Sequence, residues 1–149
     1  MSTTYLAFDY GTKRTGLAVG NDLLCTTQAL PAISTSQLRN NDGKIMLESI
    51  QPIIRIWKVN HLVFGAPLDA DAQETALSKR IKRVAHQLGN ALALPVSFAD
   101  ERYSSSEADR LLREQQQIGK KFTAKKIALR DSVAAQLILE THFSQNTTQ

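Results

Sequence analysis

Short apolar runs separated by polar turns dominate the first part of the chain. Residues 5–8 form the first run, which ends at Asp9, and residues 15–19 form the second. The polar turn between them predicts an antiparallel hairpin. A third run, over residues 23–30, predicts a strand that Pro31 should stop, because proline cannot donate a ladder hydrogen bond. We therefore expect an antiparallel meander of three strands.

The middle of the chain alternates between helix and strand patterns. Between residues 41 and 57 the apolar positions approximate helical spacing, and Pro52 should kink that helix or start a new one. The apolar residues 61–64 predict a fourth strand. Asp71 and Glu74 have the spacing of a capping box. The helix that they would open carries one apolar stripe, formed by Leu77, Ile81, Val84, Leu88 and Leu92.

The last third predicts one more strand and two helices. Residues 95–99 form a short apolar strand, and Ser104 with Glu107 forms a capping box that should open a helix. A basic loop over residues 118–126 follows, and Thr123 should cap a final helix with Ile127, Ala134, Ala135, Ile138 and Phe143 on its inner face. The fold class is therefore α/β, with a mixed five-stranded sheet that joins the antiparallel meander to parallel strands and is flanked by helices.

Composition narrows the class of protein. A chain of 149 residues and 16.5 kDa predicts a single domain, over residues 1–143, with a polar and frayed tail over residues 144–149. No apolar run reaches the roughly 18 residues that a membrane span needs, so we expect no membrane partner. The start of the chain lacks the pattern of a secretory signal, and its one cysteine, Cys25, cannot form an internal disulfide. A cytoplasmic location is the expectation.

Charge is distributed unevenly along the chain. The net charge is +4 and the isoelectric point is near 9.4. Between Lys79 and Arg130 there are twelve basic and five acidic residues, a balance of +7, so the remainder carries −3. Clustered lysine and arginine favour a polyanionic partner, because binding to phosphates releases counterions. The alternative is a solvated basic surface without a partner.

Three carboxylates occupy positions where a buried core would not place them. Asp9 ends an apolar strand, Glu101 follows another, and Asp131 lies four residues before Ala135 and seven before Ile138, on the apolar stripe of the last helix. Each also has an ordinary explanation. Asp9 could bond the backbone of its turn, Glu101 could pair with Arg102, and Asp131 could pair with Arg130 or Lys126.

Taken together, the three carboxylates indicate a metal site. The carboxyl ends of strands in an α/β sheet gather where ligands bind, and the last helix could bring Asp131 to the same edge. Converging carboxylates repel one another unless cations lie between them, and Mg²⁺ or Mn²⁺ prefers oxygen ligands. Two such ions about 3.5–4 Å apart activate a water and stabilise the leaving oxygen of a phosphodiester. An acidic metal site within a basic surface is the combination expected of a nuclease.

Four segments carry a resemblance to a known family. They are residues 8–19 (FDYGTKRTGLAV), 63–68 (VFGAPL), 100–105 (DERYSS) and 131–139 (DSVAAQLIL). In this order they resemble the YqgF/RuvX family of pre-16S ribosomal RNA nucleases, also described as Holliday junction resolvases. The resemblance spans nearly the whole chain. It departs from the family pattern at residues 69–73 (DADAQ), where a glycine is usual, and at Tyr103, which replaces a leucine.

The resemblance implies a ribonuclease H-like fold and metal-dependent hydrolysis of phosphodiester bonds. The acidic set of the family corresponds to Asp9, Glu101 and Asp131, which would act as catalytic residues and as ligands of Mg²⁺ or Mn²⁺. We prefer Glu101 to Asp100 as the ligand, since neighbours on a strand face opposite ways. Basic residues near these carboxylates are candidate contacts to the nucleic acid: Lys13, Arg14, Arg102, Lys120, Lys121, Lys125 and Lys126.

Several functions remain open at this point. The leading hypothesis is an endonuclease that processes the 5′ end of pre-16S ribosomal RNA, with a ribosome-associated or homodimeric partner as a further expectation. A resolvase of branched DNA is the first alternative, and it would need two active sites and hence a symmetric dimer. A binding module that keeps the fold without cleaving is the second. Residues 9–12 also resemble the phosphate loop of actin-like and sugar kinases, which need two such domains, more than 149 residues supply.

Overall fold

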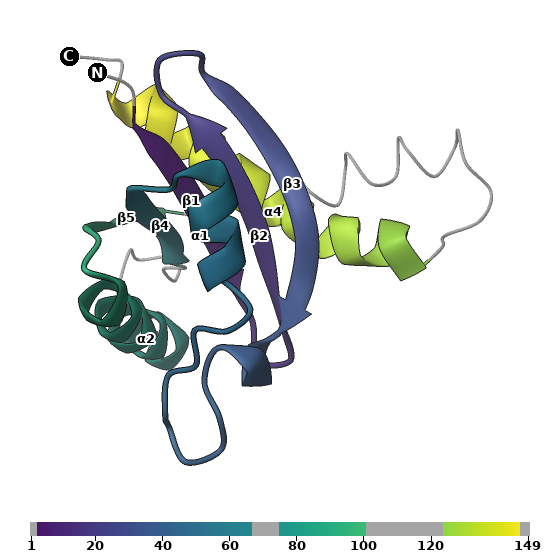
Figure 1. Ribbon diagram of the computed structural model, residues 1–149, viewed down its shortest axis with the longest axis vertical. Coiled ribbons are helices and arrows are strands. Elements are labelled where there is room, and N and C mark those ends of the chain that lie inside the picture. The colour runs from purple at the N-terminus through teal and green to yellow at the C-terminus, as the bar shows by residue number, and fades with distance from the viewer. Residues whose placement is uncertain (1–2, 67–74, 101–123, 147–149) are drawn as a thin grey trace.

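The computed structural model describes residues 3–66, 75–100 and 124–146 (Figure 1). Side chains are described within these ranges except at residues 100, 124–131 and 145–146. The predicted helix that would open at Ser104, and the predicted cap at Thr123, lie outside the described residues. No helix in these ranges is both long and apolar enough to cross a lipid bilayer.

Within the described residues, a mixed sheet of five strands forms the centre of the molecule. Its order is β3-β2-β1-β4-β5, with β1, β2 and β3 antiparallel and with β4 and β5 parallel to β1. This arrangement confirms the predicted meander with added parallel strands. The bounds are Thr4–Tyr10 for β1, Arg14–Asn21 for β2, Thr26–Ser34 for β3, His61–Ala66 for β4 and Val96–Asp100 for β5.

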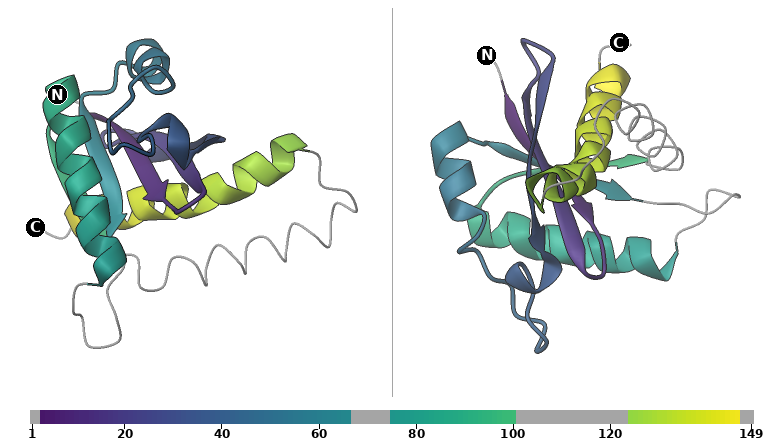
Figure 2. Two further views of the ribbon diagram at one scale, coloured as in Figure 1. Left: turned by 90° about the horizontal axis from the view of Figure 1, so that it is seen from below. Right: turned by 90° about the vertical axis from the view of Figure 1, so that its right-hand side faces the viewer.

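Helices cover both faces of the sheet (Figure 2). Helices α1 (Gln51–Trp57) and α2 (Ala76–Leu92) pack on one face, and α4 (Ala124–Asn146) lies across the other. Alternate residues of β1 enter the two cores: Leu6 and Phe8 pack towards α1 and α2, whereas Tyr5 and Ala7 pack towards α4. We call these sides the α2 face and the α4 face.

The predicted end of the third strand at Pro31 is wrong. β3 begins at Thr26 and continues through Pro31 to Ser34. Proline is tolerated here because β3 is an edge strand and needs no donor on its outer side. The register with β2 also shifts between Thr15 and Leu17, so Pro31 lies within a bulge.

The helical prediction for residues 41–57 is wrong in its first half. Only Gln51–Trp57 is helical, and Pro52 lies in the first turn, where its missing N–H costs nothing. A short 3-10 helix, Thr35–Gln37, follows β3 instead. Ile45 forms an isolated β-bridge with Arg39.

Helix α2 begins later than its sequence pattern predicts. Thr75 is the N-cap and forms a capping box with Ser78, so the predicted cap at Asp71 is wrong. Ile81, Val84 and Leu88 are buried as expected, whereas Leu77 is 36% exposed. The buried stripe is completed by Ser78, Ala85 and Gly89.

Helix α4 begins directly after the predicted cap position and extends further at its C-terminal end than predicted. It begins at Ala124, so Lys125 and Lys126 lie in its first turn and not in the predicted loop. It ends at Asn146, three residues into the tail that we expected to be frayed. The residues that it buries against the sheet include Ala135, Ile138 and Phe143, as the apolar spacing predicted.

Candidate active site

Asp9 lies where the parallel strands of the sheet end. It is the penultimate residue of β1, is half-buried, and pairs with Gly16 of β2. β1, β4 and β5 run parallel, so their carboxyl ends share one edge of the sheet. β5 ends at Asp100, directly before Glu101, which lies outside the described residues. This edge is where α/β sheets place their ligands.

Asp9 also belongs to the α4 face. Tyr5 and Ala7 pack against α4, and the register of β1 with β2 is continuous from Thr4 to Tyr10, so the period of two carries Asp9 to the same side. On β5, Ala99 packs towards α4, and Glu101 is two positions further along the sequence. The same face therefore holds Asp9 and the helix that contains Asp131.

Ser132 fastens α4 to the sheet beside Asp9. Its Oγ accepts a hydrogen bond from the backbone N–H of Leu17 at 3.0 Å and donates to the carbonyl of Leu30. The hydroxyl is thus inserted between β2 and β3 next to the bulge in their ladder. Leu17 pairs with Phe8, so this anchor lies one register position from Asp9. The backbone of Asp131 immediately precedes the anchor in α4, and its side chain is outside the described set.

Two buried threonines hold the turn between β1 and β2. The Thr35 hydroxyl donates to the Gly11 carbonyl at 2.6 Å and lies 2.8 Å from the hydroxyl of Thr15. Its backbone N–H donates to the Lys13 carbonyl at 3.0 Å. Gly11 closes the turn by donating to the Arg14 carbonyl, and a Cβ at Gly11 would lie 2.5 Å from that oxygen.

The turn presents two of the predicted basic residues next to Asp9. Lys13 and Arg14 are both exposed, as contacts to a phosphate backbone would be. The side chains of the other five predicted basic residues are outside the described set. Lys125 and Lys126 have a described backbone only, in the first turn of α4, while Arg102, Lys120 and Lys121 lie outside the described residues.

The predicted metal ligands form an all-carboxylate set. Carboxylate oxygens suit Mg²⁺ or Mn²⁺, so the donor chemistry fits such an ion. Within the described ranges, no three His, Cys, Asp or Glu side chains are grouped so that they could hold a metal. Of the predicted ligands, only the Asp9 side chain belongs to those ranges.

Two histidines meet at the opposite end of the sheet. His61 at the start of β4 and His142 near the end of α4 both pack against Tyr5, and their ring centroids are 6.2 Å apart. Burial lowers the pKa of both imidazoles. His142 lowers the pKa of His61 further, whereas Asp22 raises the pKa of His142 and so offsets part of the effect of burial. No local pattern in the sequence indicates this cluster, which lies away from Asp9.

Comparison with known proteins settles the family. The family model described as "RuvX: Holliday junction resolvase" matches residues 3–145. This chain belongs to the RuvX family. A curated RuvX relative from Burkholderia vietnamiensis is 35% identical over 142 residues, which are 95% of this chain and 89% of the relative. Another, from Glaesserella parasuis, is 37% identical and covers 99% of this chain and 100% of its own length. Both carry the name "Putative pre-16S rRNA nuclease".

Solved structures agree with the fold expected of a RuvX protein. Thermus thermophilus RuvC in complex with a Holliday junction substrate is 11% identical and superposes with a TM-score of 0.55, covering 97% of this chain and 96% of that one. A second RuvC structure from the same organism gives 0.51 with the same coverage. These likenesses confirm the ribonuclease H-like expectation for the fold. Family membership makes the chain a nuclease, a hydrolase that acts on phosphodiester bonds.

Proposed function

We propose that this RuvX chain cleaves the precursor of 16S ribosomal RNA in the cytoplasm, with Asp9, Glu101 and Asp131 as its catalytic carboxylates. The position of Asp9 carries the proposal: it lies at the carboxyl edge of the parallel strands, on the face covered by α4, one register position from the Ser132 anchor. The names of the curated relatives support the choice of RNA.

The same three carboxylates would hold Mg²⁺ or Mn²⁺, because their oxygens are the ligands that these ions prefer. A bound ion would supply a water nucleophile at neutral pH and would stabilise the leaving oxygen. The contribution of this chain is to fix the carboxylates on rigid elements. β1 holds Asp9, and the Ser132 hydroxyl holds the segment of α4 that contains Asp131.

Basic residues would position the RNA without reading its sequence. Lys13 and Arg14 project from a turn that Thr35 and Thr15 hold in place. Their cations would contact the phosphate backbone of the RNA, and the protein backbone of the turn would lose little conformational freedom on binding. We propose the same role for Arg102, Lys120, Lys121, Lys125 and Lys126. Because these contacts are to phosphates, binding should weaken as the salt concentration rises.

The deciding experiment compares cleavage by the wild-type protein with that by Asp9→Asn. The substitution removes the carboxylate charge and preserves its shape, so we expect cleavage of a pre-16S leader to fall at least a hundredfold while RNA binding stays within a few-fold. Chelation by EDTA should have the same effect on the wild type. Asp42→Asn, the same chemical change at an exposed loop position, is the matched control. Unchanged cleavage by Asp9→Asn would refute the assignment.

A four-way DNA junction belongs in the same assay, because the family description and the likeness to RuvC favour it as the second candidate substrate. Resolution of a junction needs two active sites and therefore a symmetric dimer. Paired cuts in the junction, together with a dimer in sedimentation, would favour the resolvase. Salt-dependent binding to both substrates without cleavage in Mg²⁺ or Mn²⁺ would instead favour a binding module.

A further inference from the structure

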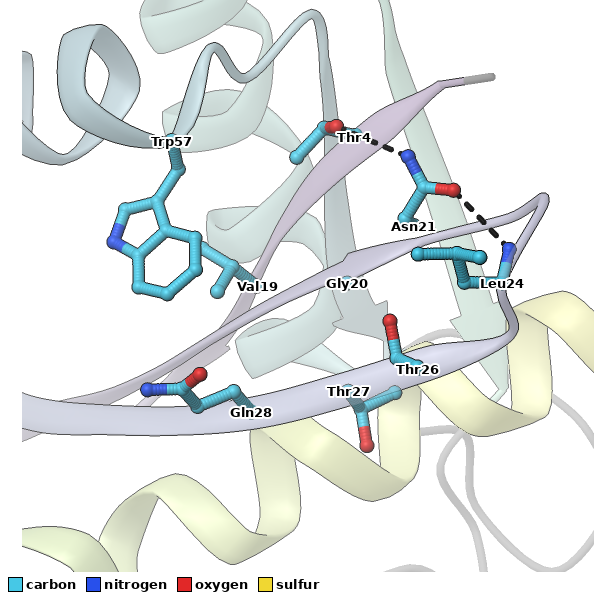
Figure 3. A pocket seen from close by; sticks show the side chains of 9 residues that line it. All are labelled: Thr4, Val19, Gly20, Asn21, Leu24, Thr26, Thr27, Gln28 and Trp57. Atoms are coloured by element: carbon cyan, nitrogen blue, oxygen red, sulfur yellow. Dashed lines mark hydrogen bonds between the residues drawn. The ribbon is translucent and has the colours of Figure 1, made fainter.

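A pocket of about 270 Å³ opens at the end of the sheet remote from Asp9 (Figure 3). It lies between the hairpin that joins β2 to β3 and the end of α1. Trp57 and Leu24 stand on opposite sides of the stretch of β2 that contains Gly20. Thr4 also lines it, five residues before Asp9 on β1, which corresponds to a separation of roughly 17 Å along the strand.

The pocket and Asp9 lie on opposite faces of the sheet. α1, which carries Trp57, packs on the α2 face, and Val19 in the pocket wall belongs to the same core. Asp9 faces α4. The pocket is therefore a separate feature and not an extension of the candidate active site.

The lining combines a flat aromatic ring with uncharged hydrogen-bonding groups. Trp57 is 38% exposed, so part of its indole is open to a ligand. Exposed Gln28 and Thr26 of β3 offer a carboxamide and a hydroxyl beside it. None of the nine lining residues is charged. This combination suits a planar and neutral ligand whose edge carries donors and acceptors.

Two cationic residues neighbour Trp57 in the sequence. Arg55 and Lys58 lie on either side of Trp57 in the sequence, at the end of α1, and both are exposed. Lys58 is held as the C-cap of α1 by a hydrogen bond from its N–H to the Ile54 carbonyl, so its backbone position is fixed. An aromatic ring flanked by cations is the arrangement that binds single-stranded nucleic acid, whose bases stack while its phosphates pair.

We propose that this pocket binds one unpaired nucleobase of the nucleic acid substrate, stacked on Trp57. Gln28 and Thr26 would bond the edge of the base, and Arg55 and Lys58 would contact the adjoining phosphates. The volume lies below the range of pockets for drug-sized ligands, so it suits a single base and not a whole dinucleotide. The inference rests on the proposed function, and it specifies a substrate with a single-stranded stretch roughly 17 Å or more from the cleaved bond.

Trp57 is the single tryptophan of the chain, so intrinsic fluorescence reports on the pocket directly. The Asp9→Asn protein is titrated with a short single-stranded RNA and with an abasic strand of equal length and charge. We expect the RNA to quench the emission and the abasic strand to leave it nearly unchanged. Both variants at this position lack the tryptophan, so their affinity is measured by the anisotropy of an end-labelled RNA. Trp57→Ala should weaken RNA binding roughly five- to hundredfold, and Trp57→Phe, which keeps a ring, should retain most of the wild-type affinity.

Ile56→Ala is the matched control, because Ile56 neighbours Trp57, is 74% exposed and does not line the pocket. It should leave the affinity for RNA unchanged. Equal quenching by the abasic strand would overturn the proposal in favour of phosphate contacts alone. Emission that depends on protein concentration without RNA would overturn it in favour of a second copy in the pocket. Absence of quenching by either strand would also overturn it.

Cleavage is measured separately on the wild-type protein, so the two hypotheses fail in different ways. If base-dependent quenching occurs but no substrate is cut, the pocket proposal stands and the nuclease assignment of Asp9 does not. If Asp9-dependent cleavage occurs and the RNA leaves the Trp57 emission unchanged, only the pocket proposal is overturned.

Discussion

The Ser132 and Thr35 hydroxyls fix the backbone on either side of Asp9. Ser132 is fully buried and bridges the Leu17 N–H and the Leu30 carbonyl, whereas Thr35 bonds the Gly11 carbonyl. A buried backbone group that loses its partner costs more than the bond itself contributes. Neither hydroxyl is a candidate for chemistry, yet both determine where the candidate carboxylates lie.

Ser132→Ala should lower the free energy of unfolding by about 1–3 kcal/mol, because it leaves the buried Leu17 N–H and Leu30 carbonyl without their partner. Urea denaturation measures this loss. Ser36→Ala, at an exposed position of the 3-10 helix, should change the stability by less than about 0.5 kcal/mol. If the two variants were equally stable, the hydroxyl would not be the anchor that the structure indicates.

Sequence patterns indicate Asp9 but not the groups that position it. Asp9 could be predicted because an aspartate at the end of an apolar strand stands out locally. The bond from Leu17 to Ser132 joins residues 115 apart, and the bond from Thr35 to Gly11 joins residues 24 apart. A single serine or threonine carries no local pattern that would indicate such a partner, so these residues were missed.

At the scale of elements, the faces of helices were predictable and their ends were not. The stripe of α2 identified the buried side correctly at Ile81, Val84 and Leu88. Its start was misplaced because Asp71 and Glu74 have capping-box spacing, whereas Thr75 and Ser78 form the actual box. Competing caps within one turn differ by little energy, so tertiary packing decides between them.

The C-terminal end of α2 offers a test of backbone conformation. Ala93 is the C-cap with φ of 58°, a left-handed conformation that costs a residue with a Cβ about 1 kcal/mol. Ala93→Gly should therefore raise the free energy of unfolding by about 0.5–1 kcal/mol. Ala91→Gly, an exposed position inside the same helix, should lower it by a similar amount. Thermal unfolding of both variants measures the sign of each change in stability. Changes of the same sign would contradict the assigned cap.

At the scale of the whole molecule, the histidine cluster links the docking of α4 to pH. Burial between β4, β1 and α4 lowers the pKa of His61 and His142, where Tyr5 packs on both rings and the charge of Asp22 partly offsets the shift of His142. Since their pKa values are lowered in the folded state, the unfolded chain binds more protons in mild acid. Stability is therefore complete above the unfolded pKa of about 6.5 and is lost as the pH falls through the lower, folded values.

We expect the melting temperature to fall between about pH 7.5 and pH 5, and His142→Gln to make that fall shallower, because one of the two suppressed protonation sites is removed. Calorimetry across this range measures the slope. His86→Gln is the control, since His86 is exposed on α2 and lies outside the cluster. An unchanged slope in His142→Gln would exclude His142 as a source of the pH dependence.

Helix α4 follows all five strands of the sheet in the sequence, so it is synthesised after them. It supplies the cover for one face of the sheet, and Gly20 of β2 approaches it so closely that a Cβ would lie 2.6 Å from Leu139. A nascent chain therefore holds the apolar side of its meander uncovered until residues 124–146 have left the ribosome. Contacts between α4 and the meander join residues far apart in the sequence, so they form slowly. Chaperones can bind the exposed apolar surface in the meantime. A product that stops before residue 124 would lack both this cover and Asp131, so the segment that completes the packing of the sheet would also complete the proposed set of catalytic carboxylates.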